Sequence, residues 1–212
     1  MITVEKVFDR SAKTYDKTEE VRFKQYTIKT LENTKKYLNK NDIVLDYGCA
    51  TGMKALELAG HVKNIYSIDI SSKMIEAAKR KAAERNIGNV DFIHTTLFDE
   101  KFKKESFDAI LAFNILHLLE DRQQAIQKIT ELLKPGGVFI STTPCLGEKM
   151  AFSTKLQFSF VRLLIKIGLF PSIKRFKFSE MEDLTATENL QIIQTEKSYH
   201  DLFGYFIVAK KI

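Results

Sequence analysis

A glycine-containing turn and an acidic residue downstream of it are the features best suited to bind a ligand. The turn, from Gly48 to Gly52, follows the apolar run Val44-Leu45-Asp46. Glycine permits a tight turn and close approach of a ligand to the backbone, and the N–H groups that begin the next helix attract a carboxylate. Asp69 ends the next apolar run, where an acid accepts hydrogen bonds from both hydroxyls of a ribose. Each feature alone is equally well explained by a structural turn or a helix cap, so their combination is the informative observation.

His117 is the candidate for a general base. It follows an apolar run that ends at Phe113, and Asn114 between them is a candidate for lining the ligand site. Its leucine neighbours favour the other interpretation, in which His117 packs in the core with one ring nitrogen hydrogen-bonded. No metal site is predicted, because no ligand spacing connects the other histidines and the cysteines. These residues are His61, His94, His200, Cys49 and Cys145.

Strand and helix patterns alternate over the first two thirds of the chain. Apolar runs predict five strands, over residues 43–46, 64–70, 90–94, 107–113 and 138–142. Helical spacing and end signals predict helices over residues 19–39, 52–60, 71–86 and 121–133. Alternation of this kind requires a mostly parallel sheet with right-handed crossovers. The predicted fold class is therefore α/β, with helices on both faces of the sheet.

The last third of the chain departs from this alternation. Patterns there predict an amphipathic helix over residues 148–168, a helix over 179–189, and a hairpin of strands over 190–199 and 203–209. The first helix is explained most economically by packing over the sheet, and otherwise by a lid over an apolar ligand or by contact with a membrane surface. We expect one domain over residues 1–212, with residues 1–40 as an N-terminal helical lid and residues 148–178 as an inserted helical segment.

The composition of the 212-residue chain is ordinary for a globular protein, with 44% hydrophobic and 28% charged residues. The two cysteines form neither a disulfide framework nor a zinc cluster. Because no signal peptide and no apolar run of about 18 residues is found, a cytoplasmic location is expected. The net charge of +6 is spread along the chain without an RNA-binding fingerprint, so no nucleic-acid partner is expected. Weak contact with a membrane surface stays open, as does the choice between monomer and homodimer.

The order of these motifs resembles that of the class I methyltransferases that depend on S-adenosylmethionine (SAM). The loop from Asp46 to Gly52, DYGCATG, is similar to the family's D-x-G-C-G-T-G loop, and Asp69 to its ribose-binding acid. Ser106-Phe107-Asp108 resembles the start of the family's fourth strand, and the segment from Leu132 to Gly137 the turn before its fifth. The resemblance is strong over residues 8–142, and the nearest group is the ubiquinone/menaquinone-type and related small-molecule methyltransferases. It implies a Rossmann-like seven-stranded sheet in the order 3-2-1-4-5-7-6, with strand 7 antiparallel.

The resemblance also implies which residues bind SAM. The segment from Phe8 to Asp16 is similar to one that folds over the cofactor in relatives, which puts Tyr15 against SAM or its methyl acceptor. Ala50 replaces the family's central glycine and is expected to keep φ below zero. Thr96 replaces an aspartate that faces the adenine amino group, so a weaker contact is expected. The implied cofactor-binding residues are Tyr15, Asp46, Gly48, Cys49, Ala50, Gly52, Asp69, Ile70, Met74, Thr96, Leu97, Phe98 and Asn114.

The predicted function is methyl transfer from SAM to a small, partly apolar molecule. Transfer from an activated sulfonium depends mainly on positioning, so no fixed catalytic set is expected. Two alternatives stay open, a SAM-binding regulatory or non-catalytic protein and a methyltransferase of a macromolecule. A nicotinamide-dependent oxidoreductase is disfavoured, because the spacing from Gly48 to Gly52 lacks the third glycine of G-x-G-x-x-G. Amino-group methylation of a nucleic-acid base is disfavoured, because Asn114 does not begin the family's N-P-P-[YF] signature.

Overall fold

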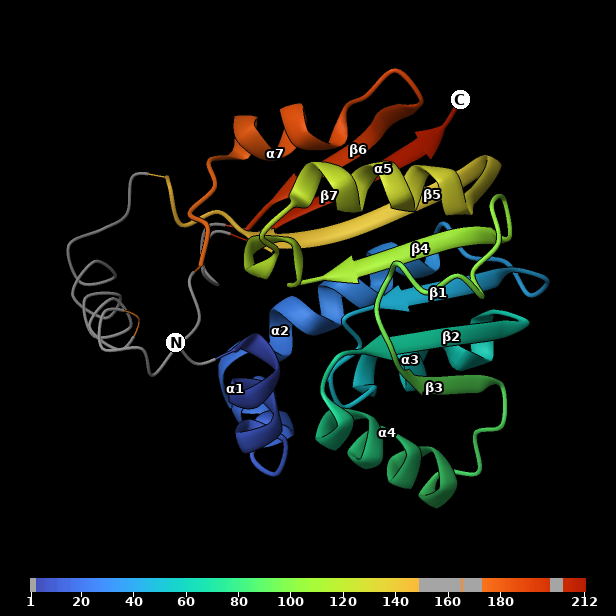
Figure 1. Ribbon diagram of the computed structural model, residues 1–212, viewed down its shortest axis with the longest axis vertical. Coiled ribbons are helices and arrows are strands. Elements are labelled where there is room, and N and C mark those ends of the chain that lie inside the picture. Colours follow the sequence, from blue (N-terminus) through green and yellow to red (C-terminus); the bar gives the residue numbers. More distant parts are fainter. Residues whose placement is uncertain (1–2, 149–164, 166–172, 199–203) are drawn as a thin grey trace.

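The protein is described here by a computed structural model, which covers residues 3–148, 165, 173–198 and 204–212. At its centre is a seven-stranded sheet in the order β3-β2-β1-β4-β5-β7-β6, which confirms the predicted order (Figure 1). The strands are β1 (Ile43–Tyr47), β2 (Asn64–Asp69), β3 (Val90–His94), β4 (Phe107–Phe113), β5 (Leu133–Pro144), β6 (Leu190–Lys197) and β7 (Gly204–Lys211). Strands β1 to β5 pair in parallel, and β7 is antiparallel to both of its neighbours, as predicted.

Strand β5 begins earlier than the predicted start at residue 138. Leu133 already pairs with Phe107, and the register shifts between Phe107 and Ala109. Gly136 has φ 77 in this stretch, a left-handed conformation that glycine adopts without a Cβ clash. The proline–glycine turn expected before the strand is therefore contained within it as an irregularity.

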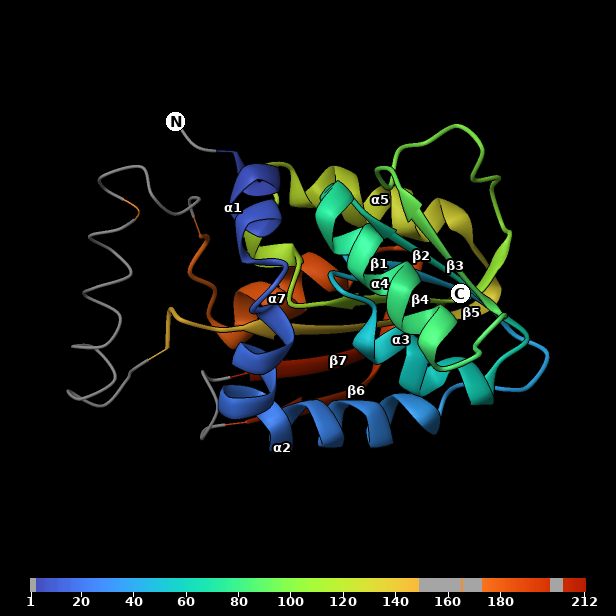
Figure 2. The same ribbon diagram turned by 90° about the horizontal axis from the view of Figure 1, so that it is seen from below.

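Helices cover both faces of the sheet (Figure 2). They are α2 (Tyr15–Lys35), α3 (Met53–Leu58) and α4 (Ser72–Glu84) on one face, and α5 (Arg122–Leu132) and α7 (Phe178–Thr185) on the other. Each face has its own hydrophobic core. Val44 and Leu111 pack in the first, and their neighbours Leu45 and Ile110 pack in the second. This alternation is the period of strands that are buried on both faces.

Side-chain caps fix the starts of two helices that the sequence predicts. Ser71 accepts a hydrogen bond from the N–H of Met74 at 3.1 Å, and Asp121 from that of Gln124 at 2.8 Å. Each cap satisfies an N–H group that has no partner within the helix. Two short 3-10 turns, η1 (Ala59–His61) and η2 (Leu116–Leu118), complete the elements that follow α3 and β4.

The N-terminal region differs from the prediction of one helix over residues 19–39. It contains α1 (Val4–Ser11), capped by the Thr3 hydroxyl, and the longer α2, which begins at Tyr15. The apolar residues of α1, Val4, Val7 and Phe8, are spaced as on one helix face, but the helix is only eight residues long and none of its side chains is buried. Figure 1 places α1 beside the edge of the sheet at which β1 to β4 end.

The predicted helix over residues 148–168 lies outside the described residues, apart from Glu148 and Ile165. Residues 173–177 of the predicted inserted segment are not helical, and α7 then begins at Phe178. Strands β6 and β7 form the predicted antiparallel pair, with a register shift between Ile192 and Gln194. Of the helices that the structure describes, none is long and apolar enough to cross a membrane.

Candidate functional site

The parallel strands end at one edge of the sheet, and the predicted site residues gather there. Asp46 lies one residue before the end of β1, Asp69 ends β2, and Asn114 follows β4. The strand register pairs Asp69 with His94, so the ends of β2 and β3 are level. Ligands of open α/β sheets bind in the crevice outside the carboxyl ends of the strands. The fold therefore brings the two predicted motifs into one site.

Backbone hydrogen bonds attach the turn after β1 to β2. The N–H groups of Gly48 and Cys49 both donate to the carbonyl oxygen of Ile68, at 2.9 and 3.0 Å. Gly48 and Gly52 have φ 74 and 76, in the left-handed region that favours glycine. Ala50 has φ 48, so the expectation that it keeps φ below zero is wrong. The sharp turn needs left-handed backbone at this position too, and the alanine Cβ makes that conformation cost about 1–2 kcal/mol.

Gly52 is required by packing. A Cβ at Gly52 would lie 2.4 Å from a ring carbon of Phe92 and 3.0 Å from the Cβ of Ala78, so a larger residue would push β3 and α4 apart. A Cβ at Gly48 would lie 2.9 Å from the side chain of Ile115. Apolar side chains thus close the Cβ side of both glycines.

Two backbone donors fix the carboxylate of Asp69. Its Oδ2 accepts from the N–H of Ala50 at 2.9 Å, and its Oδ1 accepts from the N–H of Ser71 at 2.8 Å. Burial raises the pKa of Asp69, while these hydrogen bonds and the nearby His94 oppose the rise. A carboxylate has about four lone-pair sites, so each oxygen can accept a further hydrogen bond from a hydroxyl.

The ring of His94 joins the ends of β2 and β3. Its Nε2 lies 2.9 Å from the carbonyl oxygen of Ile70. A carbonyl oxygen only accepts, so Nε2 carries the proton and donates it in this contact. The bond holds the backbone that follows Asp69.

Asp46 is buried, with 3% of its surface exposed. Burial raises the pKa of Asp46 to about 7, opposed by the charge of Lys54 and increased further by that of Asp69. A nearby opposite charge favours the ionised form of a carboxyl group. Asp46 is therefore poised to ionise when a positively charged ligand binds beside it.

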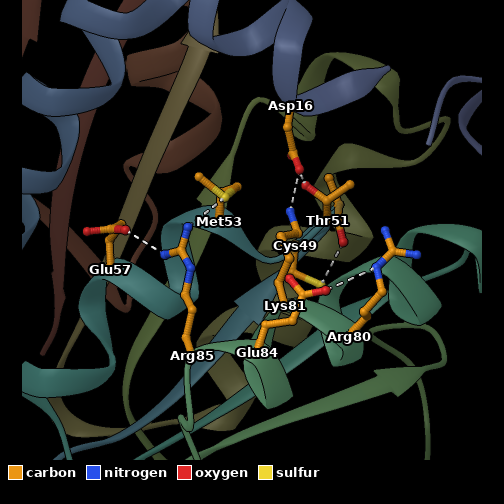
Figure 3. Close-up of polar contacts among 10 residues, drawn as sticks. Asp16, Cys49, Thr51, Met53, Glu57, Arg80, Lys81, Glu84 and Arg85 are labelled. Atoms are coloured by element: carbon orange, nitrogen blue, oxygen red, sulfur yellow. Dashed lines mark hydrogen bonds and ion pairs between the residues drawn. The ribbon is translucent and has the colours of Figure 1, made fainter. Parts of the chain in front are cut away.

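Acidic side chains of the N-terminal helices contact the elements around the turn. Asp9 accepts a hydrogen bond from the hydroxyl of Ser71 at 2.6 Å. Asp16 accepts from the Nζ of Lys81 at 2.6 Å and also from the hydroxyl of Thr51 (Figure 3). These contacts connect α1 and α2 to the turn after β1 and to α4.

Tyr15 and Glu19 continue this contact along α2. The carboxylate of Glu19 lies 3.5 Å from the Nζ of Lys54 on α3. Burial raises the pKa of Tyr15 well above its ordinary value, and the charges of Glu19 and Asp69 raise it further. Tyr15 therefore keeps its hydroxyl proton at neutral pH and is available as a donor.

A cavity of about 520 Å³ lies between the glycine turn, α2 and α3. Its volume is within the range of about 300–1,000 Å³ that is common for small-molecule sites. Part of its lining consists of predicted cofactor-binding residues, which are Tyr15, Asp46, Gly48, Cys49 and Ala50. Burial raises the pKa of Cys49 well above its usual value, and the charges of Asp46 and Asp69 contribute, so its thiol stays protonated.

The other predicted cofactor-binding residues do not line this cavity. They are Gly52, Asp69, Ile70, Met74, Thr96, Leu97, Phe98 and Asn114. Met74 and Leu97 are fully buried in the core. Ile70 and Phe98 are instead exposed, by 37% and 44%, after the ends of β2 and β3. The hydroxyl of Thr96 accepts from the N–H of Phe98 at 3.3 Å.

Asn114 and His117 follow β4. Asn114 has φ 57, and its backbone N–H donates to the carbonyl oxygen of Thr142 at 2.8 Å. His117 is buried in η2, and burial, with the charge of Arg122, lowers its pKa to about 4. Within the described part of the chain, its Nδ1 has no hydrogen-bond partner. A pKa of about 4 makes His117 a weak base at neutral pH.

The remaining cavity residues were missed by reasoning from the sequence. They are Asp16, Glu19, Lys24, Thr27, Ile28, Leu31, Thr51, Met53, Lys54, Glu57, Arg85 and Phe113. Those of α2 recur mostly at intervals of three or four residues, which is the spacing of one helix face. The predicted helix over residues 19–39 contains most of them, but the sequence does not indicate which face of that helix lies against the cavity.

The chain matches the family model described as a methyltransferase domain over residues 38–197 and therefore belongs to this methyltransferase family. It is 29% identical over 188 residues to the ubiquinone/menaquinone biosynthesis C-methyltransferase UbiE of Geotalea daltonii, which covers 82% of this chain and 77% of the relative. The N-methyltransferase NodS from Bradyrhizobium japonicum, solved with S-adenosylhomocysteine (SAH), has a TM-score of 0.75 and 16% identity over 99% of both chains. The [4+2]-cyclase SpnF has a TM-score of 0.69 and 18% identity over 86% of this chain and 80% of its own. At such identities, the two solved structures show the fold alone.

The protein is a SAM-dependent methyltransferase of class I, which confirms the predicted fold class, enzyme class and cofactor. The residues at the sheet edge fit SAM. Asp69 has lone pairs for ribose hydroxyls, and the buried Asp46 favours a cationic ligand. When bound, SAM supplies a methyl group on a positively charged sulfur, which is already activated for transfer.

Proposed function

We propose that the enzyme methylates a small, partly apolar molecule that binds in the cavity beside the glycine turn. The observation that carries the proposal is the cavity lining, in which Ile28, Leu31, Met53 and Phe113 lie near the polar Asp46. Small-molecule sites combine mostly apolar walls with a few polar groups. The relative UbiE is named a C-methyltransferase of quinone biosynthesis, which supports an acceptor of this kind.

In this proposal, the adenosine of SAM lies over the ends of β2 and β3. Asp69 accepts hydrogen bonds from the ribose hydroxyls, because its orientation is already fixed by two backbone donors. Ile70 and Phe98 pack against the adenine, which accounts for two large apolar side chains exposed at the same edge. The Thr96 hydroxyl accepts one hydrogen bond from the adenine amino group.

The methionine part of SAM then lies towards the glycine turn. The backbone from Gly48 to Ala50 borders it, and the hydroxyl of Tyr15 donates a hydrogen bond to its carboxylate. Asp46 ionises and compensates its positive charge, since an adjacent cation lowers the pKa of a buried carboxyl. We assign no catalytic base to the chain, because holding the acceptor in line with the methyl group supplies much of the rate.

The N-terminal helices act as the predicted lid of residues 1–40 over this site. Asp9 and Asp16 bind the caps and loops that surround the glycine turn, so these helices cover the cavity when the contacts form. A closed lid excludes water from the reacting groups and orients the acceptor.

Methyl transfer to purified candidate acceptors tests the proposal. The enzyme would be incubated with SAM and a 1,4-naphthohydroquinone that carries a short prenyl chain, and SAH formation would be measured by mass spectrometry. We expect turnover with this acceptor and less with catechol, which has the hydroxyls but little apolar surface. Bulk RNA and an unfolded protein mixture serve as macromolecular acceptors. Methylation of either of these, with none of the small molecules, would overturn the proposal.

A further inference from the structure

The cavity extends well beyond the predicted cofactor residues, along one face of α2. Tyr15 and Leu31 both line it. At about 1.5 Å of rise per residue, these two positions are about 24 Å apart along the helix. The opposite wall is α3, from which Met53 and Glu57 also contribute. The cavity is therefore elongated, with the glycine turn at one end only.

Apolar side chains make up much of the cavity wall. Leu31 and Phe113 are buried, Met53 is half-buried, and Ile28 is 46% exposed where the cavity opens to solvent. An exposed isoleucine at the entrance of an apolar cleft loses contact with water when a ligand covers it, which favours binding of an apolar ligand. This wall suits an apolar body rather than the polar methionine part of SAM.

Most of the charged groups along the cavity are paired within the protein. Glu19 pairs with Lys54 at 3.5 Å, and Arg85 pairs with Glu57 at 2.8 Å, as Figure 3 shows for the second pair. The same figure shows Asp16 bound to a lysine of α4. These pairs leave little net charge on the walls.

Lys24 is the exception at the rim of the cavity. It is exposed on α2, next to the entrance residues Thr27 and Ile28, and forms no ion pair with any side chain that the structure describes. Its position at the rim places its ammonium group within reach of an anion that sits at the entrance. The net charge of +6 attracts anionic ligands to the surface in general, and Lys24 provides the local contact.

We propose that the methyl acceptor is an elongated molecule with an apolar body and an anionic group, the body lying between α2 and α3 and the anionic group contacting Lys24. This inference rests on the proposed function, because it assigns the acceptor to the same cavity. It adds the position of the acceptor and the sign of its charge. Carboxylate, sulfonate and phosphate groups all meet this requirement.

Two dyes that differ in one anionic group test the inference. The sulfonate 1-anilinonaphthalene-8-sulfonate (ANS) and the uncharged N-phenyl-1-naphthylamine share an apolar aromatic body and fluoresce when it leaves water. Their affinities would be measured for the full chain and for Lys24→Glu. We expect this change to weaken ANS binding by about fivefold in low salt, as for a surface charge pair, and to leave the uncharged dye unaffected.

Lys17→Glu is the matched control, because Lys17 is an exposed lysine of the same helix that does not line the cavity. Equal weakening of ANS by both variants would overturn the proposal, since the sulfonate would then respond only to overall charge. Ile28→Glu should weaken both dyes, whereas Val21→Gln, at the exposed Val21 of α2, should weaken neither. Unchanged binding of both dyes to a folded Ile28→Glu variant would equally overturn it.

These measurements separate the inference from the proposed function. Dye binding requires no methyl transfer, so the expected pattern can hold even if no small molecule is methylated. Conversely, turnover of an anionic acceptor with the same KM in the wild type and in Lys24→Glu would support the function and contradict the contact of the anionic group with Lys24. Circular dichroism of each variant confirms that it is folded before its affinity is compared.

Discussion

The two walls of the candidate site are held in place by different interactions. Main-chain N–H groups fix the wall at the ends of β1 and β2, where Gly48 and Cys49 donate to Ile68 and Ala50 donates to Asp69. Side-chain contacts, such as that of Asp16, attach the wall formed by α1 and α2. Exposed ion pairs contribute about 0–1 kcal/mol each and weaken with salt, whereas a buried sheet does not open in this way. We therefore expect a preformed cofactor wall and an N-terminal wall that moves to admit ligands.

The largest expected effect is on the preformed wall. Asp69→Ala should weaken SAM binding by about 1.5–3 kcal/mol, or about 10- to 150-fold, because it removes hydrogen bonds to a charged group. Isothermal titration calorimetry measures this loss. Asp91→Ala removes an exposed acid from the neighbouring strand β3 and should leave affinity unchanged.

Asp69→Asn distinguishes a binding role from a structural one. An amide keeps one acceptor oxygen, so this variant should keep the turn attached more firmly than Asp69→Ala while still binding SAM less tightly than the wild type. If SAM binds to a folded Asp69→Ala variant with wild-type affinity, the ribose contact assigned to the preformed wall is wrong.

The affinity for SAM should depend on pH because of Asp46, which belongs to the preformed wall. Burial raises the pKa of Asp46 to about 7, and only the ionised carboxylate attracts the cationic SAM. Affinity should therefore rise with pH up to about 7 and then level off, with a change of about five- to tenfold between pH 6 and pH 8. Asp46→Asn should flatten this profile at the lower affinity. An identical slope in the variant would assign the titration to another group.

Asp46 should also affect stability, with a sign set by its raised pKa. The folded state binds this proton more tightly than the unfolded state, in which the carboxyl group has an ordinary pKa near 3.8. The stabilisation of the folded state by protonated Asp46 is therefore complete below pH 3.8 and is lost as pH rises through about 7. The Asp46→Asn variant has no carboxyl group that ionises. The difference between its melting temperature and that of the wild type should therefore be more positive at pH 8 than at pH 5.

A smaller effect is expected from a substitution in the N-terminal wall. Asp16→Asn removes the ion pair with Lys81, and we expect SAM to dissociate about three- to fivefold faster, for a partly exposed pair worth about 1 kcal/mol. Stopped-flow measurement of dissociation tests this, and raising the salt should speed the wild type more than the variant. Glu5→Gln in α1 is the control, because Glu5 is exposed and makes no ion pair among the described side chains. Equal dissociation rates for wild type and Asp16→Asn would show that this contact does not hold the wall closed.

The preformed wall could be predicted from the sequence, and the N-terminal wall largely could not. Asp46, Gly48 and Asp69 are adjacent to apolar runs, and the alternation of strands and helices places the ends of such runs at one edge. The bounds of β3 and β4 follow from the same local patterns, whereas the order of the strands is implied by the resemblance to the class I methyltransferases.

The wall of α2 depends instead on which helix faces which. Ile28 and Leu31 line the cavity because α2 packs beside α3, and no local pattern encodes that pairing. The start of α2 at Tyr15 was missed because the apolar and polar residues of α2 alternate only weakly around the helix and its N-cap residue, Thr14, makes no side-chain cap hydrogen bond. At Ala50 the backbone follows the demands of the turn rather than the preference of the residue, so its positive φ was missed as well.

The smallest expected effect is a gain in stability from Ala50→Gly in the preformed wall. Alanine at φ 48 is disfavoured by about 1–2 kcal/mol, while glycine adds about 0.5–1 kcal/mol of entropy to the unfolded chain. The difference should raise the free energy of unfolding by about 0.5 kcal/mol, measured by urea denaturation.

Ala83→Gly makes the same substitution at an exposed site within α4, where φ is helical, and should lower stability by about 1 kcal/mol. The opposite signs of one substitution at two sites isolate the backbone contribution. Both variants should bind SAM as the wild type does, because the N–H of residue 50 remains available to Asp69. A loss of stability in Ala50→Gly similar to that in Ala83→Gly would mean that the turn does not hold residue 50 in the left-handed region.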